Sequence, residues 1–309
     1  MTFVIHANLD CEARWAGVPL PLAVQQRISL LGALVAALAP SGAEVEVWTP
    51  VAVDPARLLA VAGWTPPALR VGTPPRADLA WADPAAKAVN DRRLAVAVGA
   101  TLGATLPGVR VLTSVDELAG ITGRWVAKAP WTSAGRDRCH GGGPPTDEQR
   151  RRLARMLARF GGLVVEPWMD RVLDVGVCAT VRADGAVIAE HPHGLLVSPR
   201  GQFLAIDLGV PALDADEARQ LAEAVTRAGA ALFERGYTGP FAIDAFAYHT
   251  LGERRFHPLC EINARYSFGW IARALGSRLG ITRLGFGAPP AGATVLIAPA
   301  ADGVTAWCA

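Results

Sequence analysis

The sequence predicts a mixed α/β protein of the α+β kind, and three patterns carry this prediction. Near the N-terminus a strand, a helix and a second strand follow one another, which is the order of an α/β unit. In the middle of the chain, a capped amphipathic helix lies between two apolar strands. After residue 167, β-type segments joined by tight turns dominate. We therefore expect an α/β unit, a small middle unit and a C-terminal antiparallel sheet.

Length and composition limit the classes of protein that need to be considered. The 309 residues suffice for about two domains, and an apolar content of 51% supplies a large core. A net charge of +2 argues against nucleic-acid binding through a broad basic surface. The longest apolar run, residues 28–39, is too short to span a membrane. The charge and the short apolar run therefore predict no nucleic-acid and no membrane partner. Five cysteines without close spacing favour a reduced, cytoplasmic protein.

The first part of the chain predicts a small α/β unit that ends near residue 85. Proline and glycine are frequent over residues 63–84, which favours a domain boundary there. The expected elements are a strand over 2–5, a helix over 28–39 and a strand over 44–48, and after the boundary a helix is expected over 87–102.

The middle part predicts two strands around a loop and a helix. A loop rich in glycine and small polar residues is expected over 132–143. Thr146 and Gln149 form a capping box at the start of the helix, and Gly161 follows its last residue, Phe160. The flanking strands are expected over 125–129 and 163–165.

The C-terminal part predicts strands, two helices and a hairpin in the tail. Asp214 and Glu217 form an acidic capping pair at the start of a helix that stops at Gly236. Two strands, over 172–182 and 186–191, are expected around an Ala-Asp-Gly turn, and a third over 202–207. Two further strands, over 241–248 and 256–263, are expected to be antiparallel neighbours. A helix over 267–279 and a hairpin around 301–303 are expected after them.

Lys128 is the first candidate binding residue. The chain has only two lysines, Lys87 and Lys128, while its other basic residues are arginines, so a lysine is informative. Lys128 stands between apolar neighbours just before the glycine-rich loop, where it could reach a phosphate under the loop's N–H groups. The alternative is a lysine that snorkels from an edge strand into water.

The second candidate is the segment that starts at Glu166 and continues with Pro167, Trp168 and Met169. A stiff connector with a large flat side chain suits an adenine ring, and Asp174 is placed to accept hydrogen bonds from ribose hydroxyls. The alternative is a linker between domains with a buried tryptophan.

The sharpest candidate is a set of oxygen-bearing side chains on two strands. Asp244 lies within an apolar strand, and Glu261 and Asn263 share one face of the next strand. Two carboxylates and an amide suit a hard cation such as Mg²⁺, and Arg265 continues the alternation with a fixed guanidinium fork. The alternative is a polar sheet face open to water, although an unpaired carboxylate among apolar residues is costly.

With these residues in view, the chain resembles the ATP-grasp superfamily over roughly residues 86–285. The strand lysine, the flexible lid, the hinge glutamate and the Glu-Ile-Asn-Ala-Arg string follow in the order of that superfamily. The resemblance implies an ATP-grasp fold with three domains: an N-terminal pre-ATP-grasp domain (1–85), a small lid domain (86–165) and a C-terminal ATP- and metal-binding domain with the tail (166–309).

The resemblance also implies a role for each matching residue. Arg92 and Lys128 contact the ATP phosphates, although Arg92 stands where the family usually has a lysine. Glu166, Trp168 and Met169 hold adenine, Asp174 holds ribose, and Pro167 lacks the N–H that a hinge contact at its position would need. The implied metal ligands are Asp244, Glu261 and Asn263, and the implied catalytic residues are Lys128 and Arg265.

The implied function is an ATP-dependent carboxylate–amine ligase that forms an acyl phosphate and ADP. ATP and Mg²⁺ are the expected cofactors, with two ions expected and Mn²⁺ as an alternative. Small-molecule or peptide carboxylates and amines are the expected substrates, and a homodimer is compatible with the pattern. The alternatives are an ATP-binding regulatory protein without ligase activity and a phosphotransferase on the same fold. The tail over 286–309 has no assigned function.

Several polar residues keep two interpretations at this stage. Arg136, Arg138 and His140 are candidates for phosphate contacts from the lid, or they belong to a solvated loop. His191, His193 and His257 are core or surface histidines, with a substrate contact as the second interpretation, because no Cys/His spacing supports a zinc site.

Overall fold

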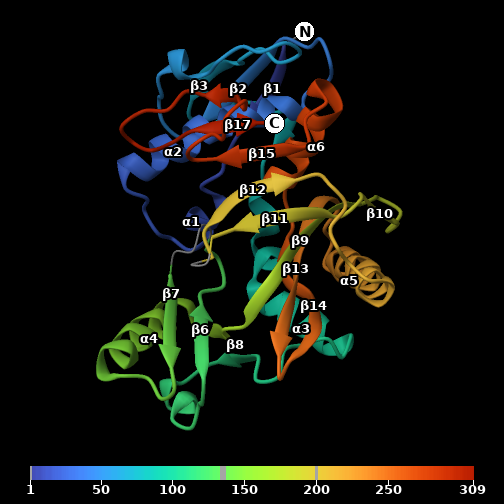
Figure 1. The fold of residues 1–309 in the computed structure, drawn as a ribbon. Helices are drawn as coiled ribbons and strands as arrows, with labels where there is room; N and C mark the ends of the chain where they lie inside the picture. Colours follow the sequence, from blue (N-terminus) through green and yellow to red (C-terminus); the bar gives the residue numbers. More distant parts are fainter. Residues whose placement is uncertain (1, 133–136, 199–200) are drawn as a thin grey trace. The chain divides into compact units, whose positions relative to one another are not determined.

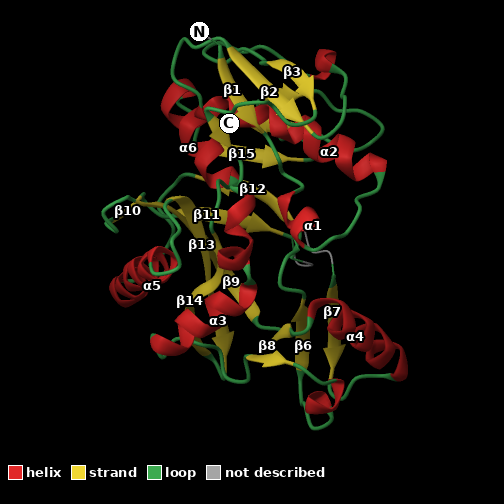
Figure 2. Cartoon of the chain, turned by 180° about the vertical axis from the view of Figure 1, so that it is seen from behind, coloured by secondary structure: helices red, strands yellow, loops and turns green. Residues whose placement is uncertain are grey.

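The computed structural model describes residues 2–132, 137–198 and 201–309 (Figures 1 and 2). The chain forms two compact units. Unit 1 comprises residues 1–85, 191–211 and 265–309, and unit 2 comprises residues 86–190 and 212–264. The division into three domains given above stays a prediction. No helix in the described part of the chain is both long and apolar enough to cross a membrane.

Unit 1 contains a parallel sheet built from the N-terminal residues. Its strand order is β3-β2-β1-β4, and the parallel register of β1 with β2 confirms the expected α/β unit. The helix expected over 28–39 begins earlier, after Pro21, whose fixed φ suits a helix start, and its last part is a 3₁₀ helix. The bounds are β1 Phe3–His6, α1 Cys11–Trp15, α2 Leu22–Gly32, η1 Ala33–Leu38, β2 Val45–Thr49, η2 Pro55–Arg57, β3 Ala68–Val71 and β4 Leu79–Ala80.

Unit 1 also contains antiparallel strands from the second half of the chain. Their order is β11-β12-β15-β17-β16, so both ends of the chain belong to this unit (Figure 1). The pairing of β16 with β17 confirms the hairpin expected in the tail. The bounds are β11 His193–Val197, β12 Phe203–Asp207, α6 Phe268–Leu279, β15 Arg283–Phe286, β16 Thr294–Ile297 and β17 Ala306–Cys308.

Unit 2 begins with a four-stranded sheet of order β5-β8-β6-β7, on which α4 packs (Figure 2). Part of the expected loop over 132–143 is in fact strand β7. A Cβ at Gly141 would lie 2.1 Å from the Trp125 ring, so glycine is what lets this indole lie across the strand. The bounds are η3 Pro84–Asn90, α3 Arg92–Thr101, β5 Arg110–Leu112, η4 Val115–Leu118, β6 Arg124–Lys128, β7 Arg138–Gly142, α4 Asp147–Phe160 and β8 Leu163–Pro167.

The rest of unit 2 is an antiparallel group in which β13 lies between β14 and β9, and β10 pairs with β9. Both predicted capping boxes are present, at Thr146 for α4 and at Asp214 for α5. The helix expected over 87–102 is divided into η3 and α3, because Asp91 caps a new helix. The bounds are β9 Asp170–Val181, β10 Val187–Ala189, α5 Ala215–Phe233, β13 Gly239–Thr250 and β14 Glu253–Asn263.

Candidate active site

A buried ion pair joins the last residue of β6 to β8. The Lys128 ammonium contacts the Glu166 carboxylate, and the two residues are only 6% and 5% exposed. Glu166 lies inside β8, opposite Val126, so its expected position after the strand is wrong. Burial opposes ionisation of Glu166, but the nearby Lys128 ammonium outweighs it and holds the pKa of Glu166 below its usual value. The pair is therefore charged, and each partner compensates the charge of the other in the core.

A second ion pair joins α3 to β14. Nη2 of Arg92 lies 2.9 Å from Oε1 of Glu261, and Arg92 is 7% exposed. The same guanidinium donates to the carbonyl of Ala129 at 2.7 Å and to Oγ1 of Thr132 at 2.8 Å. Arg92 thus connects the chain that follows β6 to Glu261, one of the predicted metal ligands.

The three predicted metal ligands lie on adjacent strands of one sheet. Asp244 of β13 is directly opposite Glu261 of β14, and Ala242 is opposite Asn263. Directly opposite residues project to the same face, and so do residues two apart, so Asp244, Glu261 and Asn263 share one face. None of the three is fully buried. Two carboxylates and an amide oxygen are a donor set that fits Mg²⁺.

A β-bulge lies between this set and the next residues of β14. From Asp244 to Phe246, β13 advances by two residues, while β14 advances by four, from Glu261 to His257. Cys260, within the bulge, is partly buried and packs against the cluster of Leu106, Phe246 and Tyr248, and burial raises the pKa of its thiol to about 11. Cys260 was not among the predicted site residues, because only Pro258 indicates in the sequence that the strand is irregular.

The predicted adenine and ribose residues do not all contact the same neighbours. Met169 packs against the cluster of Leu106, Phe246 and Tyr248. Asp174 is opposite Phe246 and accepts from Nη1 of Arg171 at 2.9 Å. The Arg171 guanidinium lies 3.8 Å from the centre of the Phe246 ring, a contact that no motif indicated.

Trp168 has a different set of neighbours from Met169. Its ring lies 4.8 Å from the His140 ring and 5.7 Å from the Arg124 guanidinium, measured between centres. Trp168 is therefore positioned by β6 and β7, whereas Met169 is positioned by β13.

The predicted catalytic residue Arg265 belongs to unit 1. Its Nε donates to Oε1 of Glu12 at 2.7 Å, and its Nη1 donates to the carbonyl of Tyr266 at 2.9 Å. Glu12 is buried and also accepts from the Cys11 thiol at 3.1 Å. These contacts fix the orientation of the Arg265 guanidinium within its unit.

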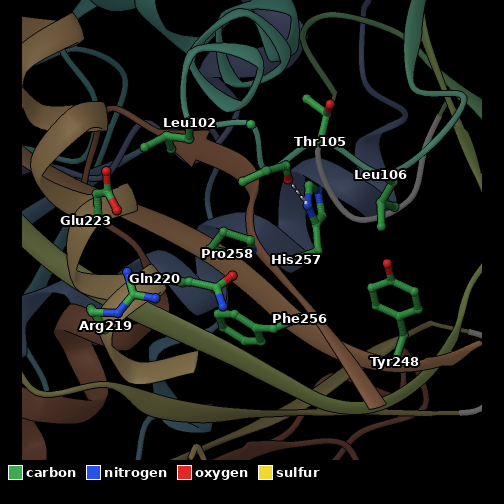
Figure 3. A pocket seen from close by; sticks show the side chains of 12 residues that line it. Leu102, Thr105, Leu106, Arg219, Gln220, Glu223, Tyr248, Phe256, His257 and Pro258 are labelled. Carbon is green, nitrogen blue, oxygen red and sulfur yellow. Dashed lines mark hydrogen bonds between the residues drawn. The ribbon is translucent and has the colours of Figure 1, made fainter. Parts of the chain in front are cut away.

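His257 lines a pocket of about 290 Å³ in unit 2 (Figure 3). Its Nδ1 lies 2.9 Å from the carbonyl of Ala104, which requires Nδ1 to donate in the neutral ring. Burial lowers the pKa of His257 to about 4, although the bond to Ala104 opposes this shift. His193 in unit 1 is also buried, and burial lowers its pKa to about 4.

We predict that His257 makes the protein less stable in mild acid. In the native state its pKa is about 4, whereas in the unfolded state it is near 6.5. Between these values only the unfolded state binds the proton, so this stability is present above pH 6.5 and is lost as the pH falls toward 4. Urea denaturation at pH 7 and pH 4.5 should show a smaller loss for His257→Gln than for wild type, by up to about 3 kcal/mol. An equal loss in both proteins would contradict this assignment.

The fold is similar to those of three solved structures of other proteins over nearly the whole chain. N5-carboxyaminoimidazole ribonucleotide synthetase from Thermus thermophilus is 14% identical, with 100% of this chain and 93% of that chain covered and a TM-score of 0.56. The biotin carboxylase domain of 2-oxoglutarate carboxylase from Hydrogenobacter thermophilus, in complex with MgADP and bicarbonate, is 13% identical, with 99% of this chain and 85% of that chain covered and a TM-score of 0.56. L-amino acid ligase from Bacillus licheniformis is 12% identical, with 99% of this chain and 92% of that chain covered and a TM-score of 0.54. The chain has an ATP-grasp fold. No family model and no curated protein matches the sequence.

Most of the candidate site residues belong to one unit of the chain. Lys128, Glu166 and the three residues on β13 and β14 all lie in unit 2, where the described contacts connect them. Arg136, one of the candidate lid residues, lies outside the described residues.

Proposed function

We propose that the protein is an ATP-dependent ligase that activates a carboxylate as an acyl phosphate, with release of ADP, and joins it to an amine or a similar nucleophile. The observation that carries the proposal is the pairing of Asp244 with Glu261 on adjacent strands, tied through Arg92 to the segment after Lys128. The solved structures with this fold include a complex with MgADP and bicarbonate and an L-amino acid ligase.

In this proposal each residue acts through its charge or its hydrogen bonds. Asp244, Glu261 and Asn263 would hold Mg²⁺, which when bound neutralises charge on the phosphates. Lys128 binds phosphate oxygens from the end of β6. Met169 contributes to an apolar surface for the adenine, and Asp174 accepts from the ribose.

Arg265 is proposed to stabilise the negative charge of the acyl phosphate. Its guanidinium is always charged and presents a planar fork that matches two oxygens. Glu12 orients this fork through the 2.7 Å bond to Nε. The substrates are expected to be small carboxylates or peptides and small amines.

We predict that ADP forms from MgATP only when a suitable carboxylate is present. The test measures ADP release with pooled amino acids and small carboxylates, with and without hydroxylamine. A carboxylate-dependent release of ADP together with a trapped hydroxamate would support acyl-phosphate chemistry. ATP binding without ADP release in any pool would favour a regulatory ATP-binding protein, and a phosphorylated product stable to hydroxylamine would favour a phosphotransferase.

A further inference from the structure

Two cations stand directly opposite each other on neighbouring strands of unit 2. Strands β6 and β7 are neighbours (Figure 1), and in their register Lys128 pairs with Arg138. Directly opposite side chains lie on the same face, and like charges in this position destabilise a sheet. An anion that contacts both residues would offset the repulsion between their charges.

The surroundings of Arg138 point to the same conclusion. Burial lowers the pKa of the half-buried Arg138 guanidinium, and Glu261 opposes this shift while Arg92 adds to it. Lys128 has Glu166 as its ion-pair partner, and Arg92 has Glu261. By contrast, the guanidinium of Arg138 forms no ion pair with any residue that the structure describes. Arg138 is thus a cation in the site whose charge no described carboxylate matches at close range.

Arg92 differs because its donors are already used. Nη1 donates to the Ala129 carbonyl and to Oγ1 of Thr132, and Nη2 donates to the Thr132 carbonyl at 2.5 Å and to Glu261 at 2.9 Å. A guanidinium has five N–H donors, and the remaining one, on Nε, is buried without a partner among the described residues. Unless these bonds are broken, Arg92 can offer a phosphate only its buried Nε hydrogen.

The segment that Arg92 holds is fixed at a second point. Nε1 of Trp131 donates to the Lys87 carbonyl at 2.8 Å, and the Lys87 ammonium lies 4.7 Å from the centre of the Trp131 ring. Residues 129–132 are therefore held against η3 and the start of α3. This segment directly follows Lys128, so fixing it also fixes the end of β6.

We propose that Arg138, together with Lys128, contacts the phosphate chain of the nucleotide, and that Arg92 is a positioning residue that ties residues 129–132 to Glu261. The proposal rests on the proposed function in that it takes ATP as the ligand. Beside the contact of Lys128, the proposal assigns the second phosphate contact to Arg138, whereas the resemblance assigned that contact to Arg92. A lysine at position 92 would keep the charge but could not make the four bonds of the planar fork.

The test compares binding and turnover in variants with matched charge. Isothermal titration with MgATP and with adenosine should show that Arg138→Gln raises the Kd for MgATP about tenfold or more, while the Kd for adenosine changes less than about twofold. Arg155→Gln is the control, because Arg155 is exposed on α4 and loses the same charge, and its Kd should stay within about twofold of wild type. Arg138→Lys, which keeps the charge, should recover most of the affinity even if the glutamine variant folds poorly.

Arg92→Lys should separate turnover from binding. Its Kd for MgATP should stay within about threefold of wild type, while kcat for ADP formation falls about tenfold or more, because Glu261 and the chain after Lys128 lose their common support. A merely structural role would lower the melting temperature without this division between Kd and kcat.

Three results would overturn the proposal. The first is a Kd for MgATP of Arg138→Gln that equals the Kd of Arg155→Gln. The second is an Arg92→Lys variant whose Kd for MgATP rises as much as that of Arg138→Gln while its kcat is unchanged. Failure of the wild type to bind MgATP would overturn both this proposal and the proposed function. Binding of MgATP without ADP formation would overturn only the proposed ligase, since the comparison of Kd values for Arg138 would still decide the phosphate contact.

Discussion

The Glu261→Gln variant is expected to form ADP from MgATP about 10³-fold more slowly than wild type, or not at all. The Glu261 carboxylate is opposite Asp244 and is half of the charge that this strand pair offers to a metal ion. An amide keeps the shape and can still accept the bond from Arg92, but the buried Arg92 guanidinium loses the charge of its partner, so the free energy of unfolding should fall by about 1–3 kcal/mol while the protein stays folded. The measurements are ADP release and urea denaturation of the same preparations.

Glu253→Gln is the matched control for this prediction. Glu253 begins the same strand, is exposed and pairs only with the neighbouring Arg255 among the described residues. Its removal should leave ADP formation within about twofold of wild type, because an exposed pair contributes little. Near-normal ADP formation by Glu261→Gln would show that Glu261 is not needed to hold a metal ion.

The candidate site could be predicted where a residue type and its strand position together specify its surroundings. Asp244, Glu261 and Asn263 follow the period of two in a strand, so the sequence alone predicts that they share a face, and the register agrees. The contacts of Arg92 could not be predicted in this way. They depend on Thr132 and Glu261, which are 40 and 169 residues away along the chain.

The fold could be predicted best where a local capping pattern or turn determines it. Thr146 and Asp214 begin the helices that they were expected to begin, because a capping box acts within four residues. Strand β7 was missed because its glycines resemble a loop, and the reason for Gly141 is the indole of Trp125 on another strand. The bulge between Glu261 and His257 was missed for the same reason, since pairing with β13 creates it.

The Lys128→Met variant is expected to lose about 3–5 kcal/mol of its free energy of unfolding, the largest effect on stability that we predict. Both members of the Lys128–Glu166 pair are buried, so removal of the ammonium leaves a carboxylate in the core without its ion-pair partner. The pKa of Glu166 should then rise, because burial raises it and the opposing charge is gone. Urea denaturation at pH 7 measures the loss.

A double variant separates the structural role of Lys128 from its role in binding. Lys128→Met combined with Glu166→Gln removes both charges, and we expect it to recover most of the lost stability, because a neutral pair needs no charge compensation. Its Kd for MgATP should nevertheless stay about tenfold or more above that of wild type, because the phosphate contact of Lys128 is still missing. Arg155→Met is the control, since Arg155 is exposed on α4 and its removal takes away one positive charge at little cost in stability. Recovery of both stability and MgATP affinity in the double variant would mean that Lys128 serves only to neutralise Glu166, and the phosphate contact would have to come from other cations.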